Sequence, residues 1–138
     1  MIDVENDVLT IVATALRTEF PGISVDGEYI ETPASFPAVT IVEADNRVLT
    51  NMRTLKIENA ASVMYEMNVY SNKVSNKKAE AKAITAKADE VFESLGFTRV
   101  FREQIPNLKD ATIYRIVCRY EAVVAPGYDG NYLIYQNY

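Results

Sequence analysis

The fold is decided by residues 62–96, which read SVMYEMNVYSNKVSNKKAEAKAITAKADEVFESLG. The first part alternates apolar with more polar side chains, which is the period of a β-strand with one covered face. Its apolar positions are Val63, Tyr65, Met67 and Val69. From Ser75 to Leu95 apolar residues recur every three or four positions, which predicts a helix, and Gly96 suits the left-handed residue after its end. The apolar face of this helix consists of Ala81, Ile84, Ala88, Val91 and Leu95. A strand that leads directly into an amphipathic helix indicates a sheet with a helix against it.

A second helix is predicted from Asp3 to about Glu19, because its apolar residues fall on one stripe. This stripe consists of Val4, Val8, Ile11, Val12, Ala15 and Leu16. Asp3 can cap the helix, and Pro21-Gly22 ends it. Residues 23–25 and 28–30 then flank Asp26-Gly27, a pair that favours a tight hairpin turn.

The β-branched run 38–42 predicts a strand. Residues 44–60, ADNRVLTNMRTLKIENA, show no lasting period, so we expect an irregular arm or a loosely paired hairpin there. Two further strands are predicted at 97–105 and 111–124. The last of these exceeds the usual ~5 to 6 residues, so we expect it to cross the middle of the sheet or project beyond it. A second Asp-Gly turn signal, at 129–130, leaves an optional edge strand near the C-terminus.

These elements predict an α+β fold, a mostly antiparallel sheet of about four to six strands with two helices packed on one face. We expect one domain over residues 1–138, with an extended arm at 44–60 and a Tyr-rich C-terminal segment at 125–138. The chain holds nine tyrosines, and four of them fall in the last eleven residues: Tyr128, Tyr132, Tyr135 and Tyr138. Because this end of the chain is so aromatic, we expect it to dock, either on its own domain as an edge strand or on a neighbouring subunit.

Composition excludes several kinds of chemistry. The 138 residues contain no His, so Ser-His-Asp and Cys-His catalysis and His-ligated metals are ruled out. The single cysteine, Cys118, is expected to be a buried, inert thiol. One cysteine cannot form an intramolecular disulfide, so the count does not indicate an oxidising compartment. The net charge of -5, from 14 basic and 19 acidic residues, argues against tight nucleic-acid binding. Neither a signal peptide nor a membrane span is predicted, so the chain is expected to be intracellular.

No constellation typical of an active site appears. The glycines fit turns and helix ends, and their spacing does not match a phosphate-binding loop. Two carboxylate clusters could hold a cation or act as acid and base, but one suits the dipole of the first helix and the other suits a solvated face of the second. These clusters are Asp3, Glu5 and Asp7, and Asp89, Glu90 and Glu93. We therefore expect no enzyme activity, no cofactor and no bound metal. A lysine group, Lys73, Lys77, Lys78 and Lys82, is either a solvated face or a contact for an acidic partner.

The order of the predicted elements and the residue types within them resemble those of the tail terminator, or tail completion, proteins of long-tailed phages. The features that carry the resemblance are the first helix ending in Phe20-Pro21-Gly22, the strand entry SFPAVTI at 35–41, the segment YEMNVYSN at 65–72 before a Lys/Ala/Glu-rich helix, the closing strand IYRIVCRYEAVV at 113–124 and a further Ile134-Tyr135. They extend over most of the chain and contain no catalytic motif.

The resemblance implies a structural virion protein at the head-proximal end of the tail, present in the host cytoplasm during assembly. Such a protein forms a homohexameric ring that caps the tail tube, stops its polymerisation and joins the tail to a head-completion protein. It has no enzymatic activity and no cofactor, contacts no membrane, and lets DNA pass through its channel without specific binding. Candidate subunit or tube contacts are Arg47, Leu49, Met52, Arg53, Leu55, Lys73, Lys77, Lys78, Tyr128, Tyr132 and Tyr135.

Other functions stay open. A stopper or adaptor of the phage neck shares this size, but would usually bring a small barrel or a helical bundle. A small carboxylate-based enzyme or a peptide-binding module could use the same α+β layer, since a fold does not determine a function. The enzyme predicts a buried carboxylate with a raised pKa in a concave pocket, and the ring predicts shallow surfaces with exposed apolar strips at subunit edges.

Overall fold

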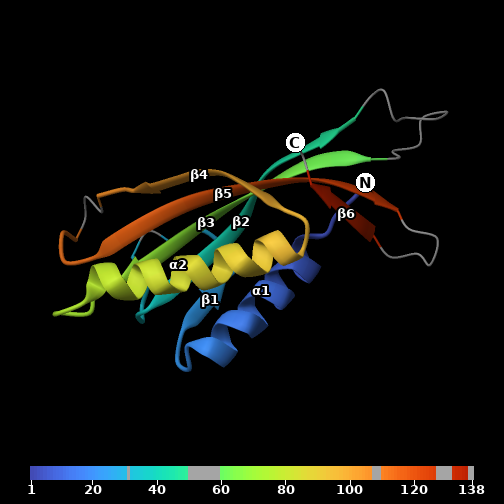
Figure 1. Ribbon diagram of the computed structural model, residues 1–138. Helices are drawn as coiled ribbons and strands as arrows, with labels where there is room; N and C mark the ends of the chain where they lie inside the picture. Colours follow the sequence, from blue (N-terminus) through green and yellow to red (C-terminus); the bar gives the residue numbers. More distant parts are fainter. Residues whose placement is uncertain (31, 50–59, 107–109, 127–131, 137–138) are drawn as a thin grey trace.

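A computed structural model of the chain describes residues 1–30, 32–49, 60–106, 110–126 and 132–136. The elements are α1 (Glu5–Glu19), β1 (Ser24–Asp26), β2 (Ala38–Val48), β3 (Ala61–Ser71), α2 (Lys77–Ser94), β4 (Thr98–Gln104), β5 (Tyr114–Pro126) and β6 (Tyr132–Gln136). The strands form one mostly antiparallel sheet, and α1 and α2 lie against the same face of it (Figure 1). The predicted α+β fold is confirmed, including the optional last strand.

The sheet has the strand order β1-β2-β3-β5-β4, and β6 also pairs with β5. β3 pairs along β5 from Ala61↔Val124 to Ser71↔Tyr114. β4 pairs with residues 116–121 of β5, and β6 pairs with residues 122–126. Because β3 takes up one side of β5, β4 and β6 follow one another along its other side. The long strand therefore crosses the middle of the sheet, as its length predicts.

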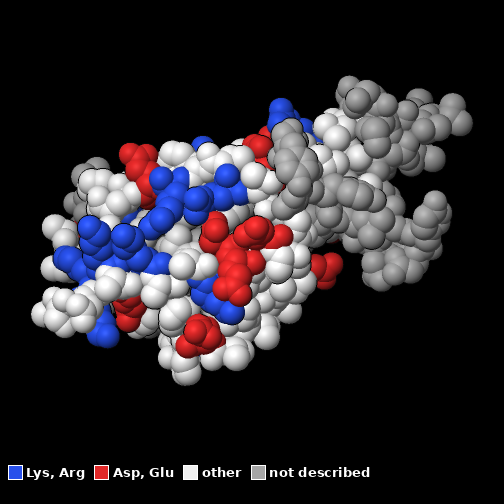
Figure 2. All heavy atoms as spheres, in the orientation of Figure 1, with Lys and Arg blue, Asp and Glu red and all other residues white. Residues whose placement is uncertain are grey.

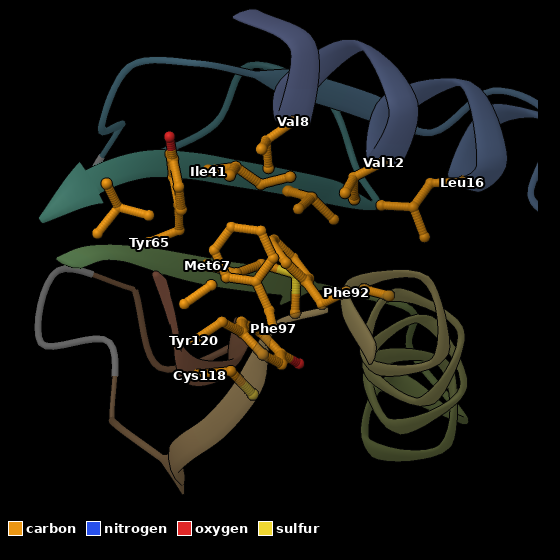
Figure 3. Packing of buried hydrophobic residues seen from close by; sticks show 14 of the residues in the cluster. Val8, Val12, Leu16, Ile41, Tyr65, Met67, Phe92, Phe97, Cys118 and Tyr120 are labelled. Atoms are coloured by element: carbon orange, nitrogen blue, oxygen red, sulfur yellow. The ribbon is translucent and has the colours of Figure 1, made fainter. Parts of the chain in front are cut away.

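The core lies between the helices and the sheet. Val8, Val12 and Leu16 of α1 and Phe92 of α2 point into it, toward Tyr65, Met67 and Tyr120 on the strands (Figure 3). The Phe92 ring stacks on Tyr120 with 4.1 Å between ring centroids, and it meets Phe97 edge-on at 5.5 Å. The structure confirms which side of each helix is apolar, but not every residue predicted on that side is buried. Ile11 is 45% exposed, and α2 buries Phe92, whereas Val91 and Leu95 are only partly buried.

The end of α2 follows its predicted chemistry, but the predicted cap of α1 does not: its N-cap residue is Val4 instead of Asp3, and no side chain makes the capping bond. Gly96 has φ 97°, and its N–H donates to the Glu93 carbonyl oxygen (3.0 Å). The Phe97 N–H donates to the Phe92 carbonyl oxygen (2.9 Å), so this glycine ends α2 as predicted. The Asp3 carboxylate accepts a hydrogen bond from the Glu5 N–H (3.0 Å). The helix itself begins at Glu5, two residues later than predicted. Before it, Ile2 and Val4 are buried while Met1 and Asp3 are exposed, an alternation typical of extended chain rather than of a helix.

The predicted hairpin at Asp26-Gly27 is wrong. The Asp26 carboxylate does accept a hydrogen bond from the Glu28 N–H, but β1 pairs in parallel with β2, from Ser24↔Ala38 onward. A Cβ at Gly27 would lie 2.8 Å from Cδ2 of Leu9 on α1, so a larger residue there would need the leucine side chain to shift. The segment after the turn joins the other face of the sheet, where the Tyr70 hydroxyl donates to the Ile30 carbonyl.

Residues 44–48 are not irregular but continue β2, so the paired-hairpin alternative is correct for this part of the predicted arm. They pair with β3 through Val48↔Ala61, and the Leu49 N–H donates to the Ala60 carbonyl oxygen at 3.0 Å. A β-bulge lies between Glu43 and Asp45. The extra residue shifts the alternation of side chains, which is why no period is visible in the sequence. The rest of the predicted arm, 50–59, lies outside the described residues.

Candidate interaction surfaces

Four lysines gather where β3 leads into α2. Lys73 lies in the connecting loop, and Lys77, Lys78 and Lys82 lie in the first part of the helix. An open hollow of about 410 Å³ is lined by residues 74–79 and by Lys82. Basic side chains dominate this end of the molecule in the view of Figure 2. We call Lys73, Lys77, Lys78 and Lys82 the lysine end.

The opposite end of α2 is acidic. Glu90 and Glu93 are exposed there, and the last turn holds no basic residue. We call these two residues the acidic end. Asp89, predicted with them on a solvated face, instead accepts a hydrogen bond from the Tyr120 hydroxyl (3.0 Å) and pairs with Arg99 (3.3 Å). The prediction was wrong for Asp89 because this residue lies at the edge of the solvated face of α2, close enough to the sheet to contact Tyr120 of β5 and Arg99 of β4.

Both ends of α2 carry charges that oppose helix stability, although Glu80 in the first turn is favourable and Lys87 pairs with Glu90 at 3.8 Å. The N-terminus of a helix has a positive partial charge and its C-terminus a negative one. Lysines in the first turn and glutamates in the last turn therefore cost roughly 0.3–1 kcal/mol each at most, less where the charge is fully solvated. Helix stability does not explain this arrangement. The charges therefore serve either contact with a partner or solubility.

The candidate contact residues fall at two opposite ends of the sheet. Val48, Ala61, Val124 and Ile134 form one row across β2, β3, β5 and β6. We call this row and its neighbours the distal end of the sheet. β3 runs from there to Ser71, beside the lysine end, a length of about 33 Å for ten steps along a strand. The protein therefore presents two separate surfaces that face apart.

The distal end holds part of the predicted arm and tail contacts. Arg47 is exposed and pairs with Asp45 at 2.9 Å, while Leu49 is half-buried. Tyr132 and Tyr135 belong to β6, so the backbone of this segment docks on its own sheet. Lys73, Lys77 and Lys78 lie at the other end. Met52, Arg53, Leu55 and Tyr128 lie outside the described residues, as does Tyr138.

The face of the sheet away from the helices carries a polar ladder that the sequence did not reveal. The Arg115 Nε donates to Asn68 Oδ1 (2.8 Å), and Arg119 Nη2 pairs with Glu66 Oε2 (3.4 Å). Arg119 also lies over the Phe101 ring at 5.5 Å. Asn68 is fully buried, so its bond to Arg115 satisfies an amide that water cannot reach. The alternation in β5 predicts which face the arginines occupy, but their partners follow only from the register of β3 on β5.

Carboxylates also gather near the start of α1. Burial raises the pKa of Glu43, and the charges of Glu5, Asp3 and Asp45 raise it further, while a hydrogen bond from Asn46 opposes the shift. Asn46 Nδ2 donates both to Glu43 Oε1 (3.0 Å) and to the Ile2 carbonyl (2.8 Å), so it fastens the N-terminal segment to β2. Within the described ranges, no group of three or more acidic or thiol side chains has the geometry to hold a metal ion.

Replacing Glu43 by Gln should stabilise the fold at neutral pH. Because the pKa of Glu43 is raised in the folded chain above its ordinary 4.5, the charged carboxylate costs stability once the pH rises through that window. The introduced amide still accepts the bond from Asn46. We expect the Tm of E43Q to exceed that of the wild type by about 2 °C at pH 7 and to match it below about pH 4. Thermal melts against pH test this, with E103Q on exposed β4 as the control, and a constant offset at every pH would contradict it.

Cys118 is buried on the helix-facing side of β5, as predicted, and burial raises the pKa of its thiol. Neither described helix combines the length and apolar character needed to cross a membrane. A scan against models of protein families and a search of curated proteins found no match to the chain.

Proposed function

We propose that the protein is a structural subunit of the phage tail terminator type. As such, it forms a ring on the end of the tail tube, stops tube polymerisation and offers a face to a head-completion protein. The observation that carries the proposal is the presence of two different candidate contact surfaces, the distal end of the sheet and the lysine end. A closed ring of identical subunits needs this arrangement, since each subunit uses one surface toward the preceding copy and another toward the next.

The distribution of carboxylates favours this function over a carboxylate-based enzyme. Among the described residues, the carboxyl group whose pKa is raised is that of Glu43, which does not line the hollow beside α2. That hollow is formed by one short segment of chain and is bordered by lysines, which suits contact with a partner surface. The net charge of -5 is compatible with a channel that DNA traverses without binding. The open α+β sheet also differs from the barrel or helical bundle expected of a stopper or adaptor.

Binding to tail tubes tests the proposal. Purified protein is mixed with tail tubes of the cognate phage and viewed by electron microscopy, and we expect rings of six subunits at one end of the tubes. Growth of tubes from purified tube protein should stop when the protein is added. Tubes that keep growing, with no density at their ends, would refute the proposal. A protein that is monomeric in free solution would not, because some rings close only on their tube.

Shortening the β2–β3 hairpin should separate folding from assembly. The Leu49–Ala60 hydrogen bond keeps the ends of the two strands paired, so Asn-Gly in place of residues 50–59 can close the hairpin as a tight turn. We expect a Tm close to that of the wild type but no ring on tail tubes. Circular dichroism and electron microscopy measure the two properties. A shortened protein that still forms rings would remove residues 50–59 from the proposed contacts.

A further inference from the structure

Four exposed charges of α2 add to its dipole, whereas two half-buried charged residues offset part of it: Glu80 in the first turn, and Lys87, which pairs with Glu90 at 3.8 Å. Lys78 and Lys82 place positive charge near the N-terminus of the helix, where the backbone is already positive, and Glu90 and Glu93 do the opposite at the C-terminus. Fifteen residues separate Lys78 from Glu93, about 22 Å along the helix. All four side chains are exposed, and Figure 2 shows basic groups gathered at one end of this face and acidic groups nearer its middle, with further basic groups beside them. The exposed charges of this helix are therefore polarised along its length.

A second copy of the chain is the partner that fits both ends. A separate acidic protein would explain the lysine end alone, and a basic protein would explain the acidic end alone. In another copy each patch finds its complement, and the energetic conflict at each helix end is relieved. The carboxylates of one copy approach the positive N-terminus of the next helix, and the lysines approach the negative C-terminus.

We infer that the acidic end of α2 in one copy binds the lysine end of α2 in the next copy, head to tail. This inference rests on the proposed ring and assigns one of its contacts. The direction of this contact agrees with the position of the distal end of the sheet, which lies beyond the C-terminal end of α2 (Figure 1). The distal end and the acidic end therefore face the same neighbour. The hollow lined by residues 74–79 and Lys82 receives the glutamates.

Exposed ion pairs contribute little singly, about 0–1 kcal/mol, and salt screens them. The contact is therefore weak between two free subunits and becomes effective when it repeats around a closed ring. Assembly should accordingly weaken as the ionic strength rises. Three exposed alanines, Ala79, Ala83 and Ala86, lie between the charged groups and present no large side chain that would hinder the approach of a neighbour.

Charge reversal tests the contact without endangering the fold. Lys78→Glu with Lys82→Glu, and separately Glu90→Lys with Glu93→Lys, each place favourable charges on the helix dipole. Glu90→Lys also removes the exposed Lys87–Glu90 pair, a small loss that the dipole offsets, so both variants should melt close to the wild type. We expect each variant alone to cap tail tubes about tenfold less well at low salt, from the loss of two exposed pairs per contact. An equal mixture of the two variants restores the pairing and should cap like the wild type. Unchanged capping by either variant, or a mixture no better than its parts, would overturn the inference.

Cross-linking distinguishes head-to-tail contacts from a two-fold pair of antiparallel α2 helices. Ala79→Cys and Ser94→Cys in one chain keep every charge, and Cys118 is buried and should not compete. With a flexible bismaleimide, head-to-tail contacts give a ladder of covalent oligomers up to the ring, whereas a two-fold pair stops at the dimer, which would overturn the inference. If reversal variants cap tubes normally, the contact is wrong and the proposed function stands. If the double-cysteine variant gives the ladder but neither it nor the wild type binds tubes, the proposed function fails and the contact stands.

Discussion

Phe92→Ala should lower the free energy of unfolding by about 3–5 kcal/mol, the range for truncating a large buried aromatic side chain. Phe92 is fully buried and lies between two other aromatic rings. It stacks on Tyr120 of β5 with the ring planes 8° apart, and it meets Phe97 just after the helix. The truncation therefore removes the contact that holds the C-terminal half of α2 to the centre of the sheet, and it leaves a cavity that the rigid strands cannot close.

Urea denaturation followed by circular dichroism measures this loss as a lower midpoint with an unchanged slope. Phe92→Leu, which keeps most of the volume, should lose less and remains measurable if the alanine variant does not fold. Ala86→Ser, on the exposed side of the same helix, should change the stability by less than about 0.5 kcal/mol. A loss below 1 kcal/mol for the alanine variant would show that α2 is held to the sheet chiefly by other contacts.

Strong local periodicity explains which elements could be predicted from the sequence. β3 and α2 follow from an unbroken period of two that changes to 3.6, and Gly96 marks the helix end by a conformation that other residues adopt at a cost. The long β5 follows from its uninterrupted alternation. These elements depend on neighbours within a few residues, and the sequence displays those neighbours directly.

Features set by distant partners could not be predicted. The turn at Asp26 suggests a hairpin, but β1 finds a parallel partner in Ala38, and nothing local distinguishes the two outcomes. The bulge near Asp45 hides the strand that continues past it. Among the candidate contacts, the lysine end could be proposed from its charges, whereas its separation from Arg47 by the length of β3 needed the topology. The Arg115–Asn68 bond likewise depends on strand register.

Tyr65→Phe should raise the free energy of unfolding by about 1–3 kcal/mol, the cost of a buried hydroxyl without a partner. Tyr65 is fully buried, and its hydroxyl has no hydrogen-bond partner among the described residues. Burial, together with nearby carboxylates led by Glu43, raises the pKa of this phenol, so the group stays neutral and cannot gain stability by ionising. Removal of the oxygen deletes an unpaired polar atom and leaves the ring contact with Phe97, at 5.5 Å, in place.

Tyr120→Phe provides the matched control, because the two tyrosines are directly opposite each other on neighbouring strands and both are buried. They differ in that the Tyr120 hydroxyl donates to Asp89 at 3.0 Å. Its loss should destabilise the fold by about 1–3 kcal/mol, since a bond to a charged acceptor disappears and, among the described residues, Asp89 keeps its contact with Arg99. The same chemical change at two paired positions is thus expected to give opposite signs in one set of denaturation curves. Destabilisation by both variants would mean that the Tyr65 hydroxyl is satisfied after all, for example by an internal water held between β3 and the acidic side chains at the start of α1.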